Sequence, residues 1–137
     1  VPKVKLVAAR IASRLYPKLA LPTGIAGKDL THDAAKAKAY EDDSLVFATA
    51  TARWFTETKA APARAIAQAP SLTMPLYEGF GTADRVASFA TGKRFFDAAG
   101  SQDKTWDART GLFHEVLNEP SWKEIVDPIA SFVLARA

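Results

Sequence analysis

Apolar residues recur every three or four positions near the start of the chain, a spacing that predicts an amphipathic helix. The stripe lies in PKVKLVAARIASRLYPKL and consists of Val4, Val7, Ile11 and Leu15. Pro17 should end this helix, because a proline cannot continue the helical hydrogen-bond ladder. Basic residues flank the stripe, so the helix could pack on its own protein or rest on an anionic membrane surface. We favour packing on the protein.

Two more helices are expected before the middle of the chain. LPTGIAGKDL reads as a loop, and either Thr31 or Asp33 can cap a helix that runs through Tyr40. A longer helical pattern extends from about Thr51 to Gln68. Pro62 lies inside that pattern, so we expect a kink or two separate helices there.

The second half changes to an alternation of strands and helices. The predicted order is a strand in LTMPLYEGFG, a helix over 89–99, a strand in KTWDAR and a helix that starts near Asn118 or Pro120. Ser88 should cap the first of these helices, and Gly100 should end it in a left-handed conformation. Strands joined through helices predict a parallel sheet. Two strands make an incomplete sheet, so we expect further strands from outside this sequence.

Composition narrows the classes of function. The 137 residues are enough for one domain with a real core, and the net charge of +3 is too small to indicate nucleic-acid binding. The absence of cysteine excludes thiolate metal sites and cysteine nucleophiles and fits a reducing compartment. No apolar run reaches the roughly 20 residues of a membrane span. The chain starts at Val1, not methionine, and we interpret it as a piece of a longer protein.

Two candidate catalytic residues lie just after the ends of the two predicted strands. Asp84 follows the first strand and His114 follows the second. Glu115 and Glu119 could be taken for a glycosidase pair, but we interpret them as loop carboxylates, one of which could order the histidine loop. The only other histidine, His32, is interpreted as a solvated neighbour of a helix cap. Two separated histidines without cysteine give little support to a zinc site.

Several motifs together resemble one family. GTADRV, DKT and GLFHEVLNEP resemble the C-terminal end of the monoacylglycerol lipase and lysophospholipase group of α/β-hydrolases, and LPTGI, AYEDDSLV and TARWF resemble its cap. The resemblance implies the C-terminal portion of an α/β-hydrolase fold, with parallel strands and crossover helices, preceded by a helical cap. Residues 1–69 would form the cap segment, and residues 70–137 would belong to the hydrolase core.

The resemblance also implies roles for individual residues. Asp84 matches the triad acid and His114 the triad base, in the chain order Ser, Asp, His of that fold. No Gly-x-Ser-x-Gly occurs in the chain, so the nucleophile would lie upstream of Val1. Trp54 and Phe55 would line an acyl pocket under the cap or, equally, only pack within it. No cofactor and no metal are implied.

The resulting hypothesis is a serine ester hydrolase for acylglycerol or lysophospholipid-like esters. This chain would supply the cap, Asp84 and His114, and would be inactive without the N-terminal half that carries the serine. The alternative is a non-catalytic remnant that binds a lipid or a partner. We expect a cytoplasmic protein with peripheral membrane contact through the cap and no nucleic-acid partner. One departure from the family is Glu78, whose burial in a strand would be costly without a partner.

Overall fold

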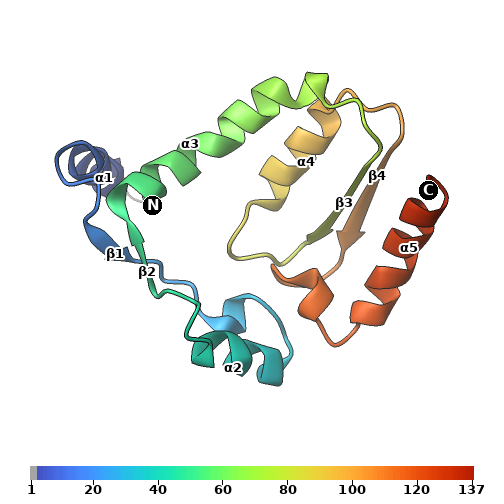
Figure 1. Ribbon diagram of the computed structural model, residues 1–137, viewed down its shortest axis with the longest axis horizontal. Helices are drawn as coiled ribbons and strands as arrows, with labels where there is room; N and C mark the ends of the chain where they lie inside the picture. The colour runs from blue at the N-terminus through green and yellow to red at the C-terminus, as the bar shows by residue number, and fades with distance from the viewer. Residues whose placement is uncertain (1–2) are drawn as a thin grey trace.

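The computed structural model describes residues 3–137, with side chains described from Val7 onward. The first half contains α1 Lys3–Leu15, β1 Ala20–Pro22, the 3-10 helix η1 Gly27–Asp29, α2 Ala34–Asp42, β2 Thr49–Thr51 and α3 Ala52–Gln68. The second half contains η2 Ala69–Ser71, β3 Leu76–Gly81, α4 Phe89–Ala98, β4 Lys104–Arg109, η3 Val116–Asn118 and α5 Trp122–Leu134. In Figure 1, α3 runs from the end that holds α1 to the end that holds α4, and α5 lies beyond the strands.

The second half forms a parallel strand pair between two helices, as the sequence predicts. β3 pairs with β4 in parallel from Leu76 opposite Lys104 to Gly81 opposite Arg109, and α4 is the crossover. Figure 1 shows α4 and α5 on opposite sides of the pair. Side chains alternate between these two faces. Four aromatic rings pack together on the α4 face: Phe80, Phe89, Phe96 and Trp106.

Gly100, two residues after the end of α4, has a different role from the predicted one. Ser88 caps the helix as expected, its hydroxyl accepting the amide proton of Thr91. Gly100, however, is not in the left-handed region. A Cβ at this position would lie 2.1 Å from the carbonyl oxygen of Pro70. Glycine is therefore needed for close packing of two backbone segments and not for a left-handed cap.

The first half is mostly helical, but it contains a strand pair where the sequence predicted none. Two strands of three residues, β1 and β2, pair antiparallel with Leu21 opposite Ala50. α3 continues through Pro62 as one helix, so the alternative of two helices is wrong. Asp33, not Thr31, caps α2, and its carboxylate accepts the amide protons of Ala35 and Lys36.

The described part of the apolar stripe of α1 is largely exposed, which goes against the packing that we favoured; Val4 lies outside the residues whose side chains are described. Val7, Ile11 and Leu15 have exposed fractions of 55%, 56% and 65%. α1 contacts α3 instead through a polar pair, in which the hydroxyl oxygens of Ser13 and Thr56 lie 2.7 Å apart. The stripe is therefore open to contact with something outside this chain.

The burial of the Glu78 carboxylate is energetically unfavourable, as the sequence already suggested. Its Oε2 atom is buried and has no hydrogen-bond partner among the described residues. Burial raises the pKa of this carboxyl above its ordinary value of 4.5, because the charged form is poorly solvated there. β3 therefore contains a polar group that destabilises the chain at neutral pH.

Replacing Glu78 with methionine should raise the free energy of unfolding at pH 7.5 by about 1 kcal/mol, because a half-buried unpartnered carboxylate disappears. A raised folded-state pKa means that wild-type stability falls as pH rises from 4.5 through that pKa. The advantage of Glu78→Met should therefore shrink toward zero as the pH is lowered to 4.5. Urea unfolding at the two pH values measures it. A loss of stability at pH 7.5 would show instead that Glu78 has a favourable partner.

Candidate active site

Asp84 lies in the loop that follows β3, and the backbone of that loop fixes its carboxylate. The side chain is 2% exposed. One oxygen, Oδ1, accepts the amide protons of Val86 at 2.7 Å and Ala87 at 2.8 Å. These two bonds leave the second oxygen free to face the loop after β4.

His114 lies in that second loop and faces Asp84. Its Nδ1 is 2.8 Å from Oδ2 of Asp84, within the range expected for a triad pair. The imidazole is 38% exposed, and among residues 3–137 its ring makes no other hydrogen bond. An ionised Asp84 can only accept, so the neutral ring carries its proton on Nδ1 and presents an unprotonated Nε2. Such a ring can accept a proton from a group placed beside Nε2.

The two loops are held together at the ends of their strands. Ala83 donates its amide proton to the carbonyl oxygen of Leu112 at 3.0 Å, and Gly111 donates to the hydroxyl of Thr82 at 2.9 Å. A Cβ on Gly81 would lie 2.2 Å from the carbonyl oxygen of Phe113. Glycine at this position thus allows the contact that brings Asp84 and His114 together.

Glu119 and His32 form a second carboxylate–imidazole contact, which the interpretation of His32 as a solvated neighbour of a cap did not include; His32 does precede the cap residue Asp33, and its side chain is 46% exposed. Glu119 is 1% exposed, and each of its oxygens lies 3.0 Å from Nδ1 of His32. Burial alone would raise the pKa of Glu119, but the hydrogen bonds from Phe113 and His32 outweigh it and hold the pKa below its ordinary value. Glu119 is therefore a buried carboxylate that stays charged.

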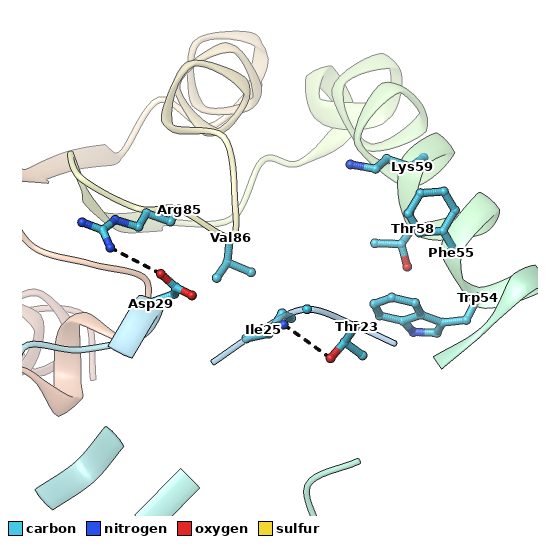
Figure 2. A pocket seen from close by; sticks show the side chains of 10 residues that line it. Thr23, Ile25, Asp29, Trp54, Phe55, Thr58, Lys59, Arg85 and Val86 are labelled. Atoms are coloured by element: carbon cyan, nitrogen blue, oxygen red, sulfur yellow. Dashed lines mark hydrogen bonds and ion pairs between the residues drawn. The ribbon is translucent and has the colours of Figure 1, made fainter. Parts of the chain in front are cut away.

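A pocket of about 380 Å³ lies between residues of the first half of the chain and the Asp84 loop. Figure 2 shows Trp54, Phe55, Thr58 and Lys59 of α3 on one side of it, Arg85 and Val86 on the other, and Thr23 and Ile25 between them. Arg85 also reaches Asp29, with 3.4 Å between Nη1 and Oδ1. Trp54 and Phe55 thus line a pocket next to the residue that follows Asp84.

Residues 3–137 contain no group of three potential metal ligands among their histidine and acidic side chains. None of the described helices is both long and apolar enough to cross a membrane.

Comparison with known proteins decides the family. A model described as "Serine aminopeptidase, S33" (Hydrolase_4) matches residues 1–121. The chain belongs to the S33 serine aminopeptidase family. Within this family it resembles monoacylglycerol lipases, and its fold is the C-terminal part of an α/β-hydrolase, as the sequence predicts.

Similar proteins include lipases from three sources. A candidate monoglyceride lipase of Schizosaccharomyces pombe is 26% identical over 128 residues, which are 92% of this chain and 34% of the relative. A monoacylglycerol lipase of Mycolicibacterium smegmatis is 33% identical over 69 residues, 50% of this chain and 25% of the relative. The crystal structure of Paleococcus ferrophilus monoacylglycerol lipase matches with a TM-score of 0.91 at 25% identity. It covers all of this chain, which in turn covers 54% of that structure. The chain thus spans from a quarter to about half of these relatives' lengths.

Proposed function

We propose that this chain is the cap and the C-terminal catalytic half of a carboxylic ester hydrolase that acts on acylglycerol or lysophospholipid-like esters. Asp84 is the triad acid and His114 the triad base. The nucleophilic serine, in a Gly-x-Ser-x-Gly turn, and the oxyanion donors belong to the preceding half of the enzyme. Residues 1–137 together with that half are called the parent enzyme below.

The observation that carries the proposal is the 2.8 Å contact between Nδ1 of His114 and Oδ2 of Asp84. A buried aspartate that fixes the imidazole tautomer and leaves Nε2 available is the arrangement that a serine nucleophile requires. The order of the two residues along the chain, each after a parallel strand, agrees with the order in α/β-hydrolases.

In the proposed reaction the serine oxygen attacks the ester carbonyl while Nε2 of His114 takes the hydroxyl proton. The imidazolium is stabilised by Asp84 and then protonates the departing alcohol, leaving an acyl-enzyme. His114 next removes a proton from water, whose oxygen attacks the acyl carbonyl. The fatty acid leaves when the serine oxygen recovers the proton. Every proton transfer in this scheme passes through one nitrogen of this chain.

The open edge of β3 supports the proposal that the parent enzyme has a preceding half. In the part of the chain that the structure describes, β3 pairs with β4 alone, and its other edge has no strand beside it. We propose that a strand of the preceding half pairs there, because an open edge of a parallel sheet is rarely left uncovered. The same half would bring the serine to Nε2 of His114.

The cap segment would contribute substrate binding. We propose that Trp54 and Phe55 hold the acyl chain in the pocket of Figure 2. The exposed stripe of Val7, Ile11 and Leu15, flanked by basic residues, would rest on a lipid surface at the periphery of a membrane. The proposed location is the cytoplasm, with no nucleic-acid partner.

The proposal is tested by a fluorophosphonate probe, which labels activated serines. Residues 1–137 alone should neither label nor hydrolyse medium-chain acyl esters, because no serine of this chain lies in a Gly-x-Ser-x-Gly turn. The parent enzyme, or the two halves expressed together, should do both. A folded parent that binds lipid but is neither labelled nor active would favour the non-catalytic remnant. Activity of residues 1–137 alone would overturn the division of the triad.

A further inference from the structure

We propose that Glu119 and His32 are positioning residues for His114. Together they clamp the residue before it, Phe113, to the cap segment. The inference rests on the proposed function, since it concerns how the triad base is held. Neither residue touches Asp84 or lines the pocket of Figure 2.

The first part of the clamp is a bond to the backbone beside the triad base. Oε1 of Glu119 accepts the amide proton of Phe113 at 2.8 Å. This bond fixes the Leu112–Phe113 peptide plane, one residue before His114, and so restrains the backbone that carries the imidazole. A buried carboxylate bonded to a backbone amide is a strong, charge-assisted restraint.

The second part of the clamp comes from the cap segment. The backbone amide of His32 donates to Oε2 of Glu119 at 3.0 Å, and the His32 ring lies within 3.0 Å of both carboxylate oxygens. The same ring stacks on Phe113, with 3.7 Å between the ring centres and 22° between the planes. Arg85, which follows Asp84, also lies over the Phe113 ring, 4.5 Å from its centre. Phe113 is thus held by groups from both the cap segment and the Asp84 loop.

Further hydrogen bonds extend the contact between residues 30–32 and the segment after β4. The amide of Glu115 donates to the carbonyl oxygen of Leu30 at 2.8 Å, and the hydroxyl of Thr31 donates to the carbonyl oxygen of Asn118 at 2.9 Å. Leu30, Thr31 and His32 therefore meet the loop after β4 in one unbroken run. Leu30 and Thr31 are both buried, so this part of the cap segment is fixed to the core.

The pattern of donors explains why the residue at position 119 has to be a carboxylate. The amides of Phe113 and His32 and the Nδ1–H of His32 all point at it, and a charged carboxylate accepts all three. A glutamine would accept on one side and would set its own NH2 group against a donor on the other. One buried donor would then be left unpaired, and the backbone at Phe113, which carries His114, would shift.

The test uses the parent enzyme and Glu119→Gln. We expect kcat to fall about 100-fold with KM nearly unchanged, because a small misplacement of the base costs rate and not binding. The proton on Nδ1 of His114, followed by NMR, should lose its strongly hydrogen-bonded signal while the near-ultraviolet circular dichroism is retained. Glu115→Gln is the matched control. Its carboxylate accepts only from Asn118 Nδ2, at 2.7 Å, which a glutamine oxygen can replace, so kcat should stay within about twofold.

A second variant covers the case in which Glu119→Gln does not fold. His32→Phe keeps the stacked ring and the backbone amide but removes the ring nitrogen, and kcat should fall about 10-fold, the effect of one charge-assisted hydrogen bond. In an Asp84→Asn background, the loss of kcat caused by whichever of Glu119→Gln and His32→Phe folds should be less than about threefold. That change and Asp84→Asn both act on the bond between Asp84 and His114. Equal effects in both backgrounds, or full kcat in a folded variant, would overturn the inference. The proposed function would stand as long as His114→Ala remains inactive, so the two failures are distinguishable.

Discussion

Replacing His114 with alanine in the parent enzyme should lower kcat for acyl ester hydrolysis by about 10⁶-fold, the loss typical of removing a triad base. The geometry gives the reason: Nδ1 is bonded to Asp84, and Nε2 is the acceptor that a serine hydroxyl would need. Without it the serine is a weak nucleophile near neutral pH. Steady-state hydrolysis of a medium-chain ester, together with the rate of fluorophosphonate labelling, measures the loss.

The other histidine provides the control for this experiment. His32 also contacts a buried carboxylate, but that carboxylate is Glu119 and not Asp84, and the His32 ring stacks on Phe113. His32→Phe should therefore retain roughly a tenth of the rate, the share expected after losing one charge-assisted bond. If His114→Ala kept more than a tenth of the wild-type rate, His114 could not be the base of the reaction.

The strand ends and their two functional side chains were predictable because the relevant signals are local. Each strand is a short run bounded by turn residues, and the carboxyl ends of adjacent parallel strands meet at one edge of the sheet. Asp84 and His114 were therefore expected to lie close together, and they do. Their catalytic roles come from the resemblance to a family and remain a prediction.

The short strands β1 and β2 were not predictable, because three residues are too few to show an alternating pattern. ALP and TAT pair across the 26 intervening residues 23–48, and their neighbours along the chain read as loop and helix cap. Pro22 even argues against a strand, although a proline is tolerated where its nitrogen faces away from the partner. The pairing is decided by the surrounding fold and not by local sequence.

The role of His32 was missed for a related reason. Thr31, His32 and Asp33 all suit the start of a helix, and only Asp33 is used in that way. Thr31 and His32 instead bond to Asn118 and Glu119, 87 residues further along the chain. The only feature of the sequence that hinted at this contact was the acidic loop after His114, in which one carboxylate was expected to order the histidine loop. The sequence did not indicate which carboxylate or which partner.

Asp84→Asn should lower kcat of the parent enzyme by about 10⁴-fold, with little effect on KM. The amides of Val86 and Ala87 both point at one side of this side chain, so the asparagine oxygen should remain there. Its NH2 group would then face Nδ1 of His114, which would have to become an acceptor. The ring proton would move to Nε2, and the base would present a donor to the serine. Steady-state kinetics give the loss, and NMR of the His114 ring nitrogens reports the exchanged tautomer.

Asp97→Asn is the matched control for this substitution, because Asp97 is an exposed aspartate that pairs with Lys93 on the surface of α4. Losing such a pair should change kcat by less than about twofold, because exposed ion pairs contribute little. Asp84→Ala separates orientation from charge. It removes the bonds to Val86 and Ala87 as well, so the Asp84 loop should loosen and stability should fall together with the rate. Asp84→Asn should lose rate with nearly wild-type stability. An Asp84→Asn enzyme that kept both the wild-type tautomer and a tenth of the rate would show that another group orients His114.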